Sequence, residues 1–361
     1  MLTRRPTMQD VARAGGVHQT TVSLALRNDP RLPAATRERL RALATKLGYA
    51  PDPMLSALNA YRSHSASQKS SVVMAFLAHF HDARELAASH PHRLFLEGAR
   101  ARAQDMGYRL EVFYFGAGPF SSSERLEKIL IARGITGLII GAFAERTAEV
   151  VIDWSRFSAV LIESQQLELS LHVVSNHQAI ITRTAIRRLH ALGYRRIGLA
   201  VGEREEIYLK NAFTAGYYVE VAQSPESRRI SPCLLSNGSV EQRVKLESWV
   251  RRHRLDAVLS NWHVVPQLLK AQGFRIPQDL VVASLDVTPH VGVNAGMRQN
   301  HRIVGERAAE QLAILMKTNQ RGLVDSPNHT LVEGVWVEGS DVPQRPLGVR
   351  PRNRIRARAD R

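Results

Sequence analysis

Four closely spaced histidines are the clearest group of potential metal ligands in this sequence. They form two His-X-His pairs, His79 with His81 and His90 with His92. A metal site requires such side chains to converge and to be held by further hydrogen bonds. The alternative is a set of ordinary loop histidines, and we favour it. We therefore predict neither a metal site nor catalytic residues here.

Signature motifs of common enzyme classes do not occur. No G-X-G-X-X-G follows the first apolar run, and neither G-X4-G-K-[ST] nor G-X-S-X-G is present. The single cysteine, Cys233, excludes a disulfide framework and a C-X-X-C zinc site, and it fits a reducing cytosol. The sequence therefore predicts a protein that is not an enzyme and needs no cofactor.

The net charge indicates what kind of partner the protein binds. The 361 residues include 49 Lys and Arg against 33 Asp and Glu, a formal net charge of +16. This surplus favours a polyanion, with nucleic acid first and an anionic membrane surface second. The hydrophobic fraction of 44% is typical of a globular chain. Because no apolar stretch approaches the roughly 20 residues of a membrane helix, we expect a cytoplasmic protein without a membrane partner.

The charge is concentrated at the two ends. Residues 1–66 contain 10 basic and 4 acidic residues, and residues 345–361 contain 7 Arg and 1 Asp. Residues 67–344 contain 32 basic and 28 acidic residues, so this part is nearly neutral. The distribution predicts a basic head, a near-neutral body and a basic tail.

The head has the pattern of three short helices. The expected ranges are 8–14, 18–27 and 34–47. Thr7 is a suitable cap for the first helix, and Gly15-Gly16 is suited to end it. Val17 is the expected buried turn residue, and the third helix is expected to bury Leu40, Leu43, Ala44 and Leu47. A helix-turn-helix of this kind presents the start of its second helix to the major groove, whereas the alternative is a helical bundle without a DNA role.

The head resembles the DNA-binding head of the lac repressor (LacI/GalR) family. The resemblance is carried by TMQDVARAGGVHQTTVS at 7–23, TRER at 36–39 and LGY at 47–49, and it runs without gaps through Ala60. It implies that Gln19 and Thr20 face base edges. It also implies phosphate contacts by Thr7, Thr21, Ser23 and Arg27.

Three departures from the family pattern distinguish this head. His18 replaces the usual serine that opens the recognition helix, and Gly15-Gly16 replaces the usual Ala-Gly turn. Leu24 stands where a base-reading arginine is common, and leucine cannot donate a hydrogen bond. Since leucine can contact a thymine methyl and Gln19 can pair with adenine, we predict a half-site that does not depend on an arginine–guanine contact.

Residues 51–61 follow the head and are expected to form a short helix with Pro53 in its first turn. Taken alone, the segment is a core helix or a linker contact. The resemblance implies a hinge helix that is ordered only on DNA, with Leu58 wedged into the minor groove. The serine-rich residues 62–71 are the expected linker.

The body, residues 72–344, alternates apolar strand-like runs with amphipathic helical stretches. This order predicts a parallel sheet covered by helices on both faces, with ligands bound at the carboxyl ends of the strands. The expected strands are 72–78, 110–115, 137–140, 159–162, 197–201, 257–259 and 280–284. The expected helices include 94–106, 124–131, 179–192 and 243–252.

The body resembles the family's effector domain in four places: residues 137–140, residues 189–199, residues 281–286 and the helix after Gly305. The resemblance implies a fold class in which a small all-α head and hinge helix precede an α/β, two-lobed domain similar to type I periplasmic binding proteins. It implies a small-molecule effector, a sugar or sugar derivative, held between the lobes. The effector-binding residues that it implies are His79, Phe80, Glu163, Phe213, Asn261, Trp262 and Asp286.

The expected effector site departs from the family pattern. Asp286 matches a family aspartate, and Glu163 stands where the family has one. Phe213 replaces the ligand-binding arginine, and Trp262 replaces the second residue of an Asn-Asp pair. A sugar remains the predicted effector, in a more aromatic pocket, and the alternative is that Phe213 and Trp262 are core residues.

The Arg-rich residues 345–361 form the expected disordered tail. They contain no leucine heptad, which favours a homodimer over a tetramer. The tail either adds nonspecific attraction to phosphates or has no role. The whole sequence predicts an effector-controlled, sequence-specific DNA-binding transcription regulator, typically a repressor, that binds a near-palindromic operator as a dimer. The alternative is a ligand-binding α/β protein or enzyme without a sequence-specific DNA role.

Overall fold

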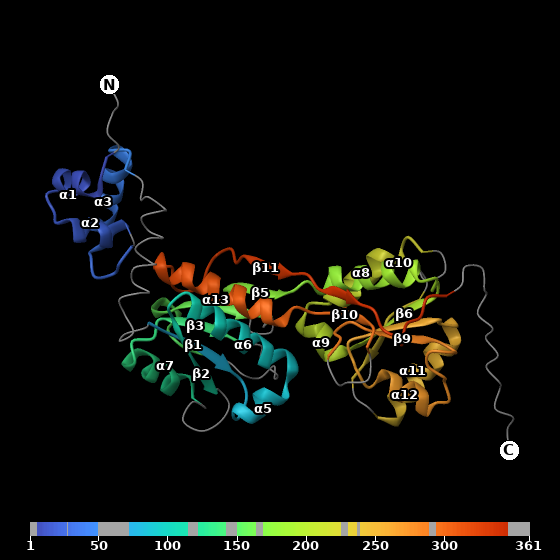
Figure 1. Cartoon of the computed structure of the whole chain (residues 1–361). Helices are drawn as coiled ribbons and strands as arrows, with labels where there is room; N and C mark the ends of the chain where they lie inside the picture. The colour runs from blue at the N-terminus through green and yellow to red at the C-terminus, as the bar shows by residue number, and fades with distance from the viewer. Residues whose placement is uncertain are drawn as a thin grey trace, which may run out of the picture. The chain divides into compact units, whose positions relative to one another are not determined.

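The structure is a computed structural model of the whole chain (Figure 1). It describes residues 6–26, 28–49, 72–114, 122–141, 150–163, 169–224, 230–236, 239–288 and 294–345. The predicted hinge helix and linker, and the tail beyond Arg345, lie outside these residues. Contacts divide the chain into a first unit, Met1–Ile162 with Leu169–His172 and Gly305–Asn328, and a second unit, Glu163–Glu168 with Val173–Val304 and His329–Arg361.

The head consists of the three predicted helices. They are α1 (Met8–Gly15), α2 (Gln19–Leu26) and α3 (Ala34–Lys46). Thr7 begins α1 with a reciprocal cap, since its Oγ1 accepts from the Asp10 amide at 3.3 Å and its own amide donates to Asp10 Oδ2 at 2.8 Å. The helices enclose a small core, which contains Val11, Ala12, Val22 and Ala44.

Glycine at both positions of the first turn has a physical reason. Gly16 has a φ of +62°, which glycine adopts without strain. A Cβ on Gly15 would lie 2.8 Å from Leu40 Cδ2, so glycine permits close packing of α1 on α3. Three expected burials were wrong in degree: Val17 and Leu43 are only half-buried, and Leu47 is 38% exposed.

One sheet contains the strands that follow the head. Its order is β11-β5-β4-β3-β1-β2, and the pairs β1–β2, β1–β3, β3–β4 and β5–β11 are parallel. Its strands are β1 (Val73–Ala78), β2 (Arg109–Tyr114), β3 (Gly137–Ile140), β4 (Ser158–Ile162), β5 (His172–Asn176) and β11 (His329–Val332). Strands β1 to β4 belong to the first unit, whereas β11 and all of β5 except His172 belong to the second. The first unit also contains α5 (Ala83–Ala88), α6 (His90–Asp105), α7 (Ser123–Ala132), the 3-10 helix η2 (Trp154–Arg156) and most of α13 (His301–Lys317).

The second sheet has the order β12-β10-β9-β8-β6-β7 and is parallel except for the β10–β12 pair. Its strands are β6 (Ile197–Gly202), β7 (Cys233–Leu235), β8 (Ala257–Ser260), β9 (Val281–Ser284), β10 (Gly296–Arg298) and β12 (Val335–Val337). The helices of this unit are α8 (Gln178–Ala191), α9 (Glu203–Tyr208), α10 (Ala212–Val221), α11 (Val240–His253) and α12 (Val265–Ala271).

Helices cover both faces of the second sheet, as predicted. Leu199 and Val201 of β6 pack into one cluster with α8 and α10, whereas Ala200 packs into another with α11 and α12. This alternation follows from the two-residue period of a strand. A Cβ on Gly216 would lie 2.3 Å from the Ala179 carbonyl oxygen, so this glycine lets α10 lie directly against α8.

All seven predicted strands and four predicted helices are present, with ends shifted by a few residues. Several elements were not predicted: the strands have three to five residues and the helices six to ten, which leaves little periodicity to detect. The missed strands are β5, β7, β10, β11 and β12, and the missed helices are α5, α9, α10 and α12. Within the described residues, no helix has both the length and the apolarity that a membrane span requires.

Candidate DNA interface and effector site

The first turn of α2 begins at His18. The His18 carbonyl accepts from the amides of Thr21 at 2.9 Å and Val22 at 3.3 Å. Its ring Nδ1 lies 3.4 Å from the Thr20 amide and 2.9 Å from Thr20 Oγ1. The imidazole thus takes the place of a serine hydroxyl as the side-chain cap. The Thr20 hydroxyl, predicted to face a base edge, has this ring as a partner inside the head.

The predicted base-reading side chains differ in exposure. Gln19 and Thr20 are exposed, whereas Thr21, Ser23 and Leu24 are half-buried. Val22 and Ala25 of the same helix are fully buried, and α2 packs against α1 and α3. The helix therefore buries one side and leaves Gln19 and Thr20 accessible at its amino end, where a recognition helix contacts base edges.

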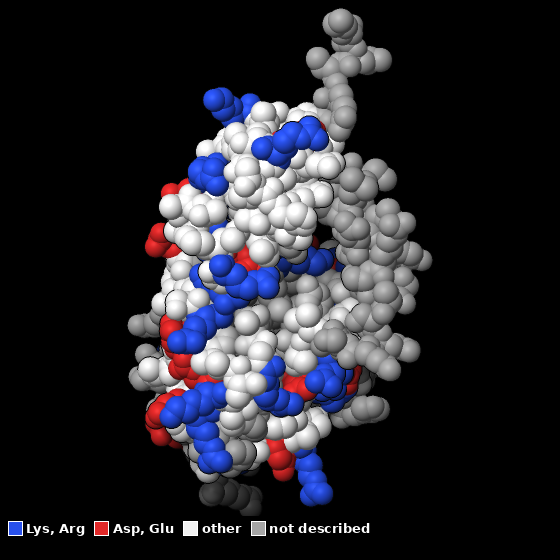
Figure 2. Space-filling model, turned by 90° about the vertical axis from the view of Figure 1, so that its left-hand side faces the viewer, with Lys and Arg blue, Asp and Glu red and all other residues white. Residues whose placement is uncertain are grey.

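Three other predicted DNA contacts lie away from the described part of α2. Thr7 Oγ1 donates to Asp10 Oδ2 at 2.6 Å, so its hydroxyl contributes to the cap of α1. Arg27 and Leu58 lie outside the described residues. Figure 2 shows that Lys and Arg side chains on one face of the molecule form several separate groups rather than one continuous patch.

Glu163 follows the last residue of β4 in a left-handed conformation, with a φ of +52°. A glutamate pays of order 1 kcal/mol for this backbone, so the surrounding structure must hold it. The Glu163 amide donates to the Val174 carbonyl at 3.1 Å. Glu163 Oε1 accepts from the Asn176 amide at 3.1 Å, Asn176 Nδ2 at 2.7 Å and Gln178 Nε2 at 3.2 Å.

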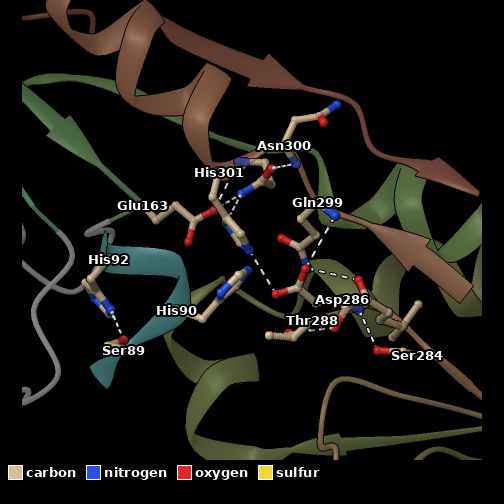
Figure 3. A network of polar contacts seen from close by, with 12 residues as sticks. Ser89, His90, His92, Glu163, Ser284, Asp286, Thr288, Gln299, Asn300 and His301 are labelled. Carbon is tan, nitrogen blue, oxygen red and sulfur yellow. Dashed lines mark hydrogen bonds and ion pairs between the residues drawn. The ribbon is translucent and has the colours of Figure 1, made fainter. Parts of the chain in front are cut away.

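The same network reaches Asp286, just beyond β9. Asn176 Nδ2 lies 3.1 Å from His301 Nδ1, and His301 Nε2 lies 2.8 Å from Asp286 Oδ2 (Figure 3). Asp286 Oδ1 accepts from the Gln299 amide at 3.4 Å. Asn176 is 0% exposed and His301 4% exposed, so both are shielded from water. All of these residues belong to the second unit.

Opposing influences act on the charge of His301. Burial lowers the pKa of His301, but the hydrogen bond and charge of Asp286, together with the charge of Glu163, outweigh burial and raise it. A second proton on the ring would have to sit on Nδ1, which faces the amide nitrogen of Asn176. Protonation of His301 is therefore coupled to the position of Asn176.

The remaining predicted effector residues lie in both units. His79 is half-buried and Phe80 is 7% exposed, with the Phe80 ring edge-on to His92 at 4.9 Å between centroids. In the second unit, Asn261 Oδ1 accepts from the Gly202 amide at 3.1 Å. Trp262 is half-buried beside the cluster that includes α11 and α12.

Phe213 lies in the hydrophobic core. Its side chain is 2% exposed and belongs to the cluster formed by α8, α10 and the second sheet. The alternative of a core residue accounts for this position, and we do not include Phe213 in the proposed site. Within the described ranges, no group of three or more His, Cys, Asp or Glu side chains is placed to hold a metal ion, and this includes His79, His81, His90 and His92.

Sequence reasoning missed four residues of the network. Asn176 and Gln178 flank the end of β5, a strand that the apolar pattern did not predict. Gln299 lies just before α13 and His301 is its first residue, whereas only the segment from Gly305 was recognised. The polar triplet of Gln299, Asn300 and His301 at the start of that helix was the available signal.

Comparison with known proteins bears on both parts of the chain. Residues 7–52 match the family described as "Bacterial regulatory proteins, lacI family". The HTH-type transcriptional regulator PtxS of Pseudomonas plecoglossicida is 30% identical over 200 residues, which are 55% of this chain and 54% of that relative. The HTH-type transcriptional regulator GntR of Pseudomonas aeruginosa is 26% identical over 331 residues, 87% of this chain and 90% of that relative.

The head therefore matches the lacI family, and the chain as a whole is similar to HTH-type transcriptional regulators. The identity with PtxS thus spans about half of that relative, whereas the match with GntR spans nearly all of it. Both relatives are named as transcriptional regulators, in agreement with the prediction that the chain is not an enzyme.

Two solved structures have a similar fold. A transcriptional regulator CelR–cellobiose complex has a TM-score of 0.58 at 19% identity and covers 93% of this chain and 100% of its own. A lac repressor dimer bound to operator and the anti-inducer ONPF has a TM-score of 0.54 at 18% identity and covers 94% of this chain and 100% of its own. The predicted fold class, a helix-turn-helix head and a two-lobed α/β domain, is confirmed.

Proposed function

We propose that this protein is a sequence-specific DNA-binding transcription regulator, typically a repressor, controlled by a small polar effector. The observation that carries the proposal is the start of α2, where Gln19 and Thr20 are exposed on a capped three-helix head that matches the lacI family. A polar, uncharged pair at this position is suited to base edges rather than to phosphates alone.

The proposed base contacts are made by uncharged side chains. Gln19 pairs with adenine through its amide, and Leu24 contacts a thymine methyl. Phosphate contacts come from Thr21, Ser23 and Arg27, and Thr7 contributes through its place at the start of α1. Dimerisation pairs two heads on a near-palindromic operator. The solved operator complex of a lac repressor dimer supports this arrangement by likeness of fold.

The proposed effector is a sugar or sugar derivative. The carboxylates of Glu163 and Asp286 accept hydrogen bonds from ligand hydroxyls, as charged acceptors in ligand sites commonly do. Asn261 and Trp262 add an amide and an indole ring, and His79 and Phe80 complete the proposed set. The CelR–cellobiose complex, which shares the fold, supports a carbohydrate as the ligand class.

The proposed domain organisation extends the sequence prediction. Residues 1–50 form the DNA-binding head, 51–61 the hinge helix, 62–71 the linker, 72–344 the effector and dimerisation domain, and 345–361 the tail. The first tail residue, Arg345, packs on the second unit, where its Nη1 lies 3.1 Å from Asp256 Oδ2. We place the protein in the cytoplasm, in contact with its DNA.

Site selection from random duplex DNA with the purified full-length chain tests the proposal. We expect enrichment of a near-palindromic sequence whose half-site does not require a guanine opposite Leu24. Binding of the selected DNA is then measured with and without D-glucose, D-galactose, D-ribose, D-gluconate and cellobiose. Enrichment of no sequence would overturn the DNA-binding role and leave the alternative of a ligand-binding protein. Selection of a half-site that needs an arginine–guanine contact would overturn the proposed base reading.

A further inference from the structure

The orientation of the buried Asn176 amide is fixed by two independent partners. The Asn300 backbone N–H donates to Asn176 Oδ1 at 3.1 Å, and a backbone amide can only donate. On the other side, Asn176 Nδ2 lies 2.7 Å from Glu163 Oε1, and a carboxylate oxygen accepts. If the amide were reversed, its nitrogen would face the Asn300 N–H, donor against donor, and its oxygen would face Glu163 Oε1, acceptor against acceptor. Only one orientation therefore satisfies both contacts.

This orientation also determines the proton position on His301. Asn176 Nδ2 carries two hydrogens, one for Glu163 Oε1 and one for His301 Nδ1, which lies 3.1 Å away. Nδ1 must therefore accept, and the proton of the neutral ring is on Nε2. The Nε2–H then donates to Asp286 Oδ2 at 2.8 Å. Asn176 thus donates to both Glu163 and His301, and His301 donates to Asp286, with each group in its proper role.

The arrangement leaves acceptor capacity on both carboxylates. Three donors from Asn176 and Gln178 converge on Oε1 of Glu163, and its second oxygen points away from the network in Figure 3. Each oxygen of Asp286 accepts one hydrogen bond, from Gln299 or His301, and a carboxylate oxygen can accept two.

We propose that Asn176 and His301 are positioning residues that hold the carboxylates of Glu163 and Asp286 as one hydrogen-bonded unit for the hydroxyl groups of the effector. The inference rests on the proposed function for the role of the two carboxylates. The buried bridge, which Asn176 and His301 form between the two carboxylates, follows from the observed contacts and does not depend on that role. Because Asn176 and His301 are shielded from water, loss of one contact leaves a buried polar group without a partner and disturbs both carboxylates.

The proton position on His301 is the first test, and it needs no effector. Nitrogen-15 NMR of histidine-labelled full-length protein, with His301 assigned from the His301→Phe variant, reports which ring nitrogen carries the proton. In the neutral form we expect the proton on Nε2. A neutral ring protonated on Nδ1 would overturn the proposal, because it cannot accept from Asn176 and donate to Asp286.

Effector binding is the second test, with whichever sugar of the five-member panel changes DNA binding by the wild-type chain. We expect His301→Phe, which keeps the ring shape without nitrogens, to weaken binding of that sugar about tenfold. His301→Gln keeps one donor and one acceptor, and it should recover most of this loss. Equal losses for both variants, or no loss in either, would overturn the proposal.

A control variant separates positioning from general stability. His172 is also a buried histidine, 8% exposed, and its Nδ1 accepts only a backbone amide, that of Asn328 at 2.9 Å. His172→Phe should lower the unfolding temperature but leave sugar affinity unchanged, and an equal loss of affinity would count against a positioning role. If no sugar in the panel acts, the proposed effector class fails, and the NMR result alone decides the arrangement of the bridge.

Discussion

Gln19 is the residue on which recognition of the DNA base sequence is expected to depend most. It is exposed at the first turn of α2, and a glutamine amide can form a bidentate pair with adenine. We predict that Gln19→Ala costs about 1–3 kcal/mol of operator binding and relaxes preference at one base pair of each half-site. Affinity measurements on single-base variants of the selected site check this. Uniform weakening on every sequence would instead assign Gln19 to phosphate contact.

Leu24 is the second residue that sets the half-site. It is half-buried on α2 and has no polar atom in its side chain. We predict that Leu24→Arg restores an arginine–guanine contact, so that site selection with this variant enriches guanine at a position where the wild-type chain does not. An unchanged selected sequence would mean that residue 24 lies away from the base edges.

At the scale of elements, a buried carboxylate joins α8 to α10. Glu220 is 8% exposed and accepts from Arg187 Nε at 2.7 Å and from Arg183 Nε at 3.1 Å. Burial raises the pKa of Glu220, but the hydrogen bonds and charges of the two arginines outweigh it and lower the pKa. The stabilisation is therefore present above the unfolded-state pKa and is lost as the pH falls through the lower, folded-state value.

We predict that Glu220→Gln lowers the free energy of unfolding by about 1 kcal/mol at neutral pH, and that this difference disappears in acid. Thermal unfolding of both chains across a pH series checks the prediction. Glu241→Gln, at an exposed carboxylate of α11, is the control and should change little. A difference between Glu220→Gln and wild type that grows in acid would contradict the sign of the shift.

Elements with a strong local signal could be predicted from the sequence. The cap at Thr7, the double glycine and the apolar spacing of α3 are local features, and the three head helices followed from them. Strands β10 and β12, of three residues each, have no comparable signal. Their formation depends on pairing with each other and on the parallel pair of β10 with β9.

The candidate effector site could be predicted only in part. Glu163 and Asp286 were expected from the family resemblance, and each lies at or just beyond the end of a strand that the apolar pattern identified. The bridge between them was not expected, because Asn176 and His301 are 125 positions apart in the chain and are brought together only by the fold. The burial of Phe213 likewise depends on α10 lying against α8, which no local pattern encodes.

At the scale of the whole molecule, the hinge is expected to connect the two functions. A segment of eleven residues is too short to form a stable helix alone, so DNA contact can control whether it forms. We predict that Leu58→Ala preserves the fold of the head but weakens operator binding and reduces DNA bending. Circular permutation gel shifts on the selected site check this. Unchanged affinity and bending would contradict the wedge assignment.

The tail allows a separate test of whether its positive charge contributes to DNA binding. Residues 346–361 carry six arginines. If they attract phosphates, their removal should lower the slope of log affinity against log salt by up to about 0.9 for each lost phosphate contact, equally on selected and random DNA. An unchanged slope after truncation at residue 345 would mean that the tail has no role in DNA binding.

The most direct test of the central claim is the ratio of affinities of the full-length chain for its selected operator and for a scrambled duplex of equal length. Fluorescence anisotropy at one fixed salt concentration gives both values. A sequence-specific regulator predicts a ratio of about 10³ or more, which falls when Gln19 is replaced by Ala. Equal affinity for the two duplexes, unaffected by Gln19→Ala, would contradict the account.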